Sequence, residues 1–320
     1  MATIVFGIGY IGSALVQELL FQGREVIGFD NFFSTDQRAI DGFRQSPGFS
    51  FVEGSITDPT AVERALASAD EAVDAVFILA AQSSAHSEAA TAEYTEETNL
   101  RGPRVILDCL DRRRGRSPVV FASSMRVYGS PLPETVSECS SLGSFRDLSH
   151  LSKCYVEKLL EMYSETRGLL ARSVRLGLTF GVAPVMKTDS RFMTAPNLFC
   201  FQVAAGHPIT IRSRDPLAII HVDDAIDALL LAASGDSEAN YAVYNACGEV
   251  ATIPEIGAKL VQIASERDLD AVVDAAPEAV GQQPVRPVVT SRLTTRGFAP
   301  RRTLRDGLTA TLDHFLVRGK

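Results

Sequence analysis

The chain has 320 residues, of which 46% are hydrophobic and 22% are charged, and its formal net charge is −8 at pH 7. This composition excludes a disordered chain and predicts a globular protein with a substantial core. The negative charge disfavours nonspecific binding to nucleic acid, so an anionic ligand needs a local cationic pocket.

The cysteines and the amino-terminal segment indicate where the protein works. The five cysteines, at positions 109, 139, 154, 200 and 247, show no Cys-x-x-Cys or Cys/His spacing. We therefore expect reduced thiols, no metal and a cytoplasmic location. The opening MATIVFGIGYIGSALVQELL lacks a basic leader and is broken by glycines, so it is neither a signal peptide nor a membrane span, and we expect no membrane partner.

Up to about residue 180, short apolar runs alternate with longer stretches of helical periodicity. Runs of strand length cover residues 3–8, 25–30, 49–54, 75–81, 118–124 and 171–181. Helical stretches cover residues 13–23, 60–69, 99–113 and 152–168. Continuous apolar strands separated by helices predict a parallel sheet covered on both faces, which is an α/β doubly wound (Rossmann) fold.

After residue 180 the pattern loosens, and prolines at 184, 196, 208 and 216 punctuate shorter elements. Helices are expected at 223–233, 253–266 and 304–315, with a strand near 242–247. The spacing predicts a doubly wound domain over 1–180. It also predicts a smaller, substrate-binding lobe over 181–320, interleaved with the sheet and packed on its carboxyl edge.

A glycine-rich turn joins the first predicted strand to the first predicted helix. Gly7, Gly9 and Gly12 form Gly-x-Gly-x-x-Gly, which allows a tight turn and the close approach of a diphosphate to the helix amino terminus. Asp30 ends the second strand about 20 residues later, where a carboxylate binds ribose hydroxyls and repels a 2′-phosphate. The pattern favours NAD over NADP; the alternative is that the glycines only cap a strand and Asp30 begins a turn.

Several segments, in this order, resemble one known family. They include FGIGYIGSALVQELL, GFDNFFST, GSITD, ILAAQSS, ETNLRG, FASSMRVYG, HLSKCYVEK, HVDDAIDALLLA and GFAPRRTLRDGL. The chain is similar to the extended short-chain dehydrogenase/reductases that modify nucleotide sugars. The resemblance implies that the dinucleotide also contacts Tyr10, Ile11, Asn31, Ser55, Ile56, Leu79, Ala80, Ala81, Asn99 and Lys153. It also implies a homodimer through two helices, for which apolar faces near residues 100–110 and 153–163 are suitable.

The catalytic group of that family is a Ser or Thr, a Tyr and a Lys. Ser124 and Lys153 match two members, but Ser149 stands where the tyrosine is expected, and a serine hydroxyl is too weak an acid to replace a phenol. Tyr155 is rotated about 200° from Lys153 along a helix. Three interpretations stay open: another base (Tyr128, His150 or a water held by Ser124 and Ser149), neutral Lys153 as the base, or loss of catalysis.

Met125 and Arg126 follow Ser124, at positions where hexose 4,6-dehydratases of the family carry Asp and Glu. Neither side chain is a usable proton donor for expelling a C6 hydroxyl, so an ordinary 4,6-dehydratase is not expected. Ordinary 4-epimerases accept such residues but keep the tyrosine. Met125 belongs either to the catalytic group or to plain packing against the nicotinamide.

The expected substrate contacts are also altered. The family motif that begins at Arg175 has Leu178 in place of its Asn, and Leu217 replaces an expected Arg. The resemblance implies substrate contacts from Ser83, Asn197, Leu198, Arg214 and Arg286, with Arg212 as an alternative to Arg214. Arginine is preferred because its guanidinium pairs with phosphate through two hydrogen bonds.

The resemblance therefore implies an enzyme that modifies a UDP-sugar without net oxidation, through hydride transfer from C4 to NAD and back. The favoured product arises from dehydration of a UDP-N-acetylhexosamine across C5 and C6, because a C4 ketone acidifies the C5 proton. A UDP-sugar 4-epimerase is the alternative enzyme, and a non-catalytic NAD or nucleotide-sugar sensor is the alternative without chemistry.

Overall fold

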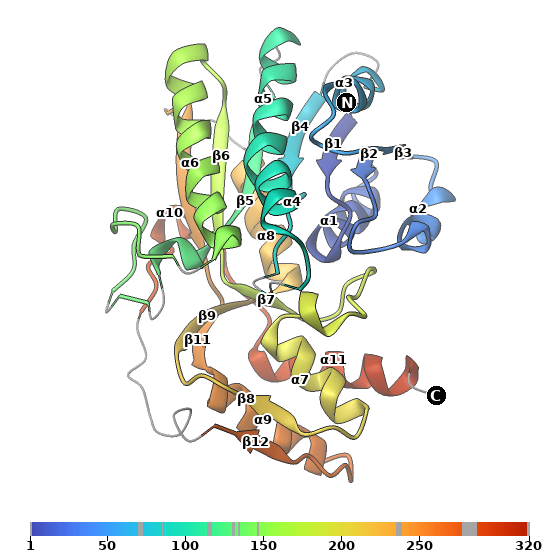
Figure 1. Ribbon diagram of the computed structural model, residues 1–320, viewed down its shortest axis with the longest axis vertical. Helices are drawn as coiled ribbons and strands as arrows, with labels where there is room; N and C mark the ends of the chain where they lie inside the picture. Colours follow the sequence, from blue (N-terminus) through green and yellow to red (C-terminus); the bar gives the residue numbers. More distant parts are fainter. Residues whose placement is uncertain are drawn as a thin grey trace.

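The computed structural model describes residues 2–69, 73–84, 86, 88–113, 117–129, 132–133, 135–145, 147–234, 239–276 and 287–318. A large sheet flanked by helices forms one part, and a smaller lobe packs beneath its carboxyl edge (Figure 1). Among the described residues, none of the helices combines the length and the apolar character that crossing a membrane requires. The five cysteines are unpaired.

The large sheet is parallel and has seven strands in the order β10-β6-β5-β4-β1-β2-β3. The strands are β1 (Ala2–Phe6), β2 (Glu25–Asp30), β3 (Phe49–Glu53), β4 (Val73–Ile78), β5 (Val119–Ser124), β6 (Ala171–Leu176) and β10 (Tyr241–Ala246). The order reverses between β1 and β4, which places a crevice at the carboxyl ends of these two strands. The predicted Rossmann fold is confirmed.

Helices cover both faces of this sheet (Figure 1). One face packs against α3 (Pro59–Ala67), α5 (Gly102–Arg113) and α6 (Leu148–Arg167). The other packs against α1 (Tyr10–Phe21) and α8 (Val222–Ala233), with Phe43 of the short α2 (Asp41–Arg44) at its edge. The short α4 (Ala92–Glu96) precedes a π turn at Glu97–Arg101 that leads into α5.

The run at residues 171–181, predicted as one strand, is two strands. It breaks at Gly177 into β6, in the large sheet, and β7 (Leu178–Phe180), which pairs with β9 (Pro216–His221). A Cβ at position 177 would lie 3.0 Å from the carbonyl oxygen of Ala218, so the absence of a side chain lets the backbone cross to the second sheet. β11 (Glu249–Thr252) completes that sheet antiparallel to β9.

The smaller lobe has its own apolar core. Its elements are α7 (Ala195–Ala204), β8 (Ile209–Ile211), α9 (Ile253–Ser265), β12 (Val273–Ala275) and α11 (Leu304–Arg318), while the short α10 (Ser291–Thr294) lies against β10. β10 is a strand of the large sheet and α8 packs on that sheet, although both follow residue 180. The two parts are therefore interleaved in sequence, and a boundary at residue 180 separates only the first pass of the chain.

Candidate active site

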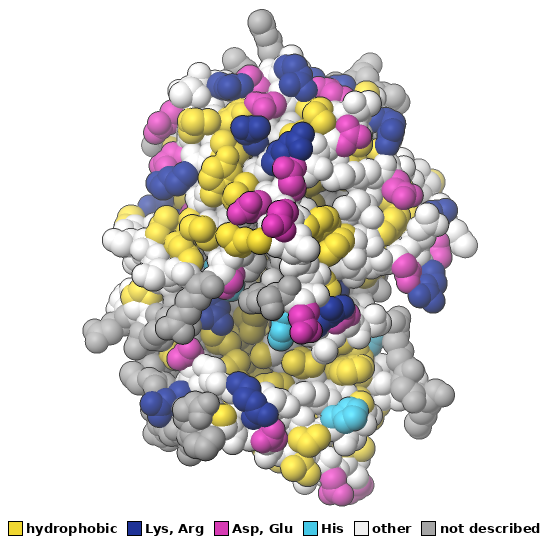
Figure 2. Space-filling model, in the orientation of Figure 1, with side chains coloured by type: hydrophobic (Ala, Val, Ile, Leu, Met, Phe, Trp, Pro, Cys, Tyr) yellow, Lys and Arg dark blue, Asp and Glu magenta, His cyan; other side chains and the backbone are white. Residues whose placement is uncertain are grey.

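A cavity of about 490 Å³ lies at the carboxyl ends of β1, β2, β4 and β5, between the sheet and the smaller lobe. Figure 2 shows hydrophobic side chains recessed between these two parts. The lining of the cavity combines residues of the glycine turn, of β5 and α6, and of the lobe segment before α7. One cavity thus joins a nucleotide-binding turn to the segment that carries Ser124 and Lys153.

The glycine turn fits a dinucleotide. Gly7 has φ of +99°, and a Cβ there would lie 2.4 Å from the backbone nitrogen of Ala80. A Cβ at Gly12 would lie 1.8 Å from the carbonyl oxygen of Gly7. Asp30 accepts hydrogen bonds from the backbone N–H groups of Ile8 (2.6 Å) and Phe32 (2.7 Å), which fixes its carboxylate at the end of β2, where ribose hydroxyls bind.

Most residues predicted to bind the cofactor line this cavity: Gly7, Gly9, Tyr10, Ile11, Gly12, Asp30, Asn31, Ile56, Leu79, Ala80, Ala81 and Lys153. Ser55 and Asn99 lie outside its lining. The Ser55 hydroxyl is hydrogen-bonded to Thr57, at 2.8 Å. The buried Asn99 bonds the backbone of Gln82 with both its oxygen and its nitrogen, each at 2.8 Å, so it positions the cavity wall from behind.

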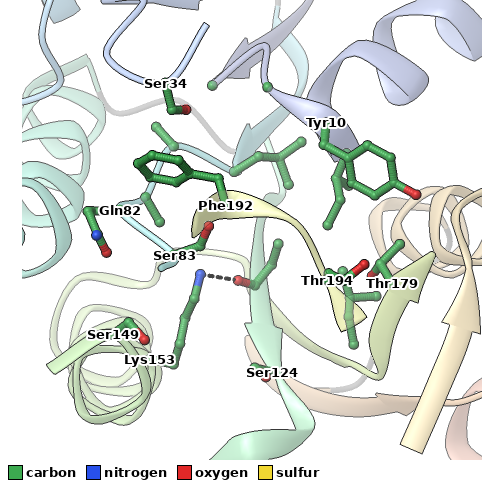
Figure 3. Close-up of a pocket in the computed structure, with 18 of the residues that line it drawn as sticks. Tyr10, Ser34, Gln82, Ser83, Ser124, Ser149, Lys153, Thr179, Phe192 and Thr194 are labelled. Atoms are coloured by element: carbon green, nitrogen blue, oxygen red, sulfur yellow. Dashed lines mark hydrogen bonds between the residues drawn. The ribbon is translucent and has the colours of Figure 1, made fainter. Parts of the chain in front are cut away.

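Lys153 reaches the cavity from α6 (Figure 3). Its Nζ donates a hydrogen bond to the carbonyl oxygen of Ala122 (2.7 Å) and lies 4.7 Å from the centre of the Phe121 ring. Burial lowers the pKa of Lys153 to about 8, against an opposing effect of Glu157. Ser124 and Met125 line the cavity too, with Met125 only 3% exposed.

The first turn of α6 contains an Asp–His pair. Asp147 is the N-cap, and it accepts hydrogen bonds from the Ser149 hydroxyl (2.6 Å) and the His150 backbone N–H (3.0 Å). Its second oxygen lies 2.6 Å from Nδ1 of His150. Burial alone would raise the pKa of Asp147, but the hydrogen bonds from Ser149 and His150 outweigh burial and lower this pKa.

Both Ser149 and His150 line the cavity. The helix begins at Leu148, only two residues before His150, and in this first turn the imidazole bends back to the N-cap. No described residue is hydrogen-bonded to Nε2 of His150. Tyr155, in contrast, is 41% exposed and lies outside the cavity lining, in agreement with its predicted rotation away from Lys153.

Tyr128 does not reach the cavity, so the prediction that it supplies the base is not supported. Its hydroxyl donates to Asn245 (2.7 Å) and accepts from Arg175 (2.6 Å). Burial raises the pKa of this phenol, although Arg175 acts in the other direction. Arg175 is itself paired with buried Glu157 at 2.6 Å, so this cluster is structural and lies behind the cavity wall.

Only some of the residues predicted to contact the substrate lie at the cavity. Ser83 lines the cavity, whereas Leu198 and Arg214 do not. Asn197 accepts a hydrogen bond from the backbone N–H of Gly181 (3.0 Å) and borders a small neighbouring pocket. Arg286 lies outside the described residues.

Other cations line the cavity instead. They are Arg126, Lys187 and Arg191, besides Lys153. Burial lowers the pKa of Arg126, while Asp215 and Asp147 oppose that effect. Lys187 was missed because no motif surrounds it. The described residues contain no cluster of three or more His, Cys, Asp or Glu side chains that could hold a metal ion.

The chain matches a known protein family over most of its length. Residues 3–247 match the model of the NAD dependent epimerase/dehydratase family. The chain belongs to this family. Its cofactor is therefore NAD, in agreement with the glycine turn and Asp30, and like other members of the family it is an enzyme.

Members with known activities resemble the chain over most of its length. UDP-glucuronic acid decarboxylase 5 of Arabidopsis thaliana is 25% identical over 98% of this chain and 88% of its own length. UDP-glucose 4-epimerase of Lactobacillus helveticus is 25% identical over 72% of this chain and 70% of its own. The Thermus thermophilus UDP-glucose 4-epimerase, solved with NAD, superposes with a TM-score of 0.82 at 25% identity, covering 98% of this chain and 99% of that one.

Proposed function

We propose that this enzyme oxidises C4 of a UDP-sugar transiently, modifies the keto sugar and reduces it again, without net oxidation. One observation carries the proposal: a single cavity joins the NAD-binding turn to Ser124, Lys153 and the Asp147–His150 pair. The uridine diphosphate part is supported by the relatives, whose names are UDP-sugar decarboxylases and 4-epimerases.

In this proposal His150 replaces the missing tyrosine. Its Nδ1 proton is held by Asp147 (2.6 Å), so Nε2 accepts the proton of the C4 hydroxyl, and the Asp147 carboxylate stabilises the imidazolium that forms. Lys153 and Ser124 bind the reacting hydroxyl and the ribose by hydrogen bonds, and Lys153 also contributes its positive charge. When bound, NAD supplies the hydride acceptor at this end of the cavity.

The product distinguishes the possible outcomes. We expect incubation of the purified protein with UDP-N-acetylglucosamine and UDP-glucose, followed by mass spectrometry and NMR, to show conversion of at least one of them. Unchanged mass with inversion at C4 indicates the epimerase, which the named relatives favour. Loss of one water indicates the 5,6-dehydratase. If no UDP-sugar is converted or exchanges its C4 hydrogen, the sensor hypothesis replaces the enzyme.

Within this proposal, the specific reaction that we predict is dehydration across C5 and C6, as in the hexosamine 5,6-dehydratase of tunicamycin biosynthesis. Asp30 is the only carboxylic acid among the described residues that line the cavity, and it belongs to the cofactor end. Elimination therefore depends on the acidity that the C4 ketone gives to the C5 proton. His150 then acts twice: it passes the C4 hydroxyl proton to the C6 oxygen, which leaves as water, and it takes the C5 proton, which it returns to the C4 oxygen when the hydride returns to C4.

We also propose that the enzyme is a homodimer. Helix α6 carries three exposed apolar side chains, Leu151, Tyr155 and Met162, spaced four and seven residues apart on one stripe. α5 packs beside α6. We expect sedimentation to give twice the chain mass, and Leu151→Lys together with Tyr155→Lys to give monomers; a wild-type monomer contradicts this proposal.

A further inference from the structure

We propose that Lys187 is a cofactor-binding residue, whose ammonium group binds the diphosphate of the dinucleotide from the side of the smaller lobe. The inference concerns only the NAD site. It holds whichever sugar the enzyme modifies and whatever becomes of the C4 ketone.

The position of the ammonium group is the first observation. A Cβ at Gly9 would lie 3.5 Å from Nζ of Lys187. Gly9 is the N-cap of α1, and a glycine at this place leaves room for the diphosphate to approach the helix amino terminus closely. The lysine thus places a positive charge against the space that the missing side chain leaves open.

The partners of the ammonium group are the second observation. Nζ donates to the Ser34 hydroxyl at 2.7 Å and lies 3.4 Å from the Ser34 carbonyl oxygen. The ammonium group is half-buried, and among the described residues no carboxylate forms an ion pair with it within 4.0 Å. Burial lowers the pKa of Lys187, and the Asp30 carboxylate, which acts on it from farther away, only partly opposes that effect. A bound anion in direct contact would offset the remaining cost of the partly buried charge.

The lobe segment that carries Lys187 is fixed over the cavity. Arg191 donates a hydrogen bond to the carbonyl oxygen of Glu88 (2.8 Å). The ring of Phe192 meets that of Phe33 edge-on, with 6.4 Å between the centres. In Figure 3, Ser34 and Phe192 lie apart from Ser149 and Lys153, so Lys187 faces the nucleotide end of the cavity and is preorganised there.

Three phosphate groups could be the anion: the diphosphate of NAD, the 2′-phosphate of NADP or the diphosphate of the substrate. The nearby Asp30 carboxylate, held by Ile8 and Phe32, repels a 2′-phosphate. The substrate's diphosphate is the weaker candidate, because Gly9, which Lys187 faces, belongs to the turn that binds the diphosphate of a dinucleotide. The amino terminus of α1 and Gly9 favour the diphosphate of NAD.

The test is titration calorimetry with NAD+, ADP-ribose, NADP+ and UDP on the full chain freed of bound nucleotide. We expect Lys187→Met to weaken NAD+ and ADP-ribose about 10- to 100-fold and to leave UDP unchanged. Lys187→Arg keeps the charge and should restore most of the affinity. The matched control is Lys158→Met, an exposed lysine paired with Glu161, which should bind NAD+ as the wild type does.

Circular dichroism and thermal melting establish that each variant folds. The proposal is overturned if folded Lys187→Met binds NAD+ within twofold of the wild type. It is equally overturned if only NADP+ or only UDP loses affinity, since the anion is then a different phosphate. Absence of any UDP-sugar conversion would refute the proposed function and leave this result intact.

Discussion

Replacing His150 with glutamine is expected to lower kcat by about 10²- to 10⁴-fold, which is the usual contribution of a general base. Glutamine keeps an N–H group that can bond Asp147 but cannot take up a proton near neutral pH. His150 is the proposed acceptor because its Nδ1 is held 2.6 Å from Asp147 and the residue lines the same cavity as Lys153. Steady-state kinetics with the converted UDP-sugar, together with NAD+ titration, measure the effect.

Two further variants separate catalysis from folding. Asp147→Asn keeps a good N-cap for α6 but removes the charge that stabilises the imidazolium. It should lower kcat by about tenfold or more and leave KM unchanged. Tyr155→Phe is the matched control and should keep the wild-type rate, because Tyr155 lies outside the cavity. Wild-type kcat in His150→Gln would exclude His150 as the base and leave Lys153, or a water held by Ser124 and Ser149, as the candidates.

The cofactor-binding end of the site can be predicted from the sequence because the residues that form it are close together in the chain. Gly7, Gly9 and Gly12 lie within six residues of one another, and the backbone geometry that requires them is that of one turn. Continuous apolar runs likewise predicted six strands of the large sheet, because most of these strands are buried on both faces, although the edge strand β3 is only half-buried. The exception is residues 171–181, where contact with β9, about 40 residues later, decides the break.

The reacting end depends on contacts between distant segments, which the sequence does not display. Tyr128 follows Ser124 closely, yet its hydroxyl is taken by Asn245, 117 positions away. Lys187 approaches Gly9 only because the lobe folds over β1 and β2. The Asp147–His150 pair is local, and an Asp three residues before a His at a helix start signals it. In the sequence, the serine at position 149 in place of the expected tyrosine is the more conspicuous feature of this helix start.

Lys153→Met is expected to lower kcat by at least about 10²- to 10³-fold, the loss typical of removing one preorganised charged donor. The ammonium group stands at the reacting end of the cavity, bonded to the carbonyl oxygen of Ala122 at 2.7 Å. Methionine keeps much of the side-chain volume but neither the charge nor the donors. The variant should still fold, which thermal melting checks, and an unimpaired rate would contradict this placement of the active site.

The pH dependence of kcat decides between Lys153 as a cation and Lys153 as the base. Burial lowers its pKa to about 8, so the protonated form prevails below pH 8 and the neutral form above it. If the reaction needs Lys153 as a cation, kcat falls as the pH rises through about 8, because the ammonium group loses its charge. If Lys153 is the base, kcat rises over the same range, because only the neutral amine can accept the proton. Lys153→Arg supplies the matched comparison, because a guanidinium stays charged throughout this range and cannot accept the proton. With His150 as the base, Lys153→Arg should retain measurable turnover and lose the decline near pH 8, whereas an inactive Lys153→Arg with a rising wild-type profile would make Lys153 the base.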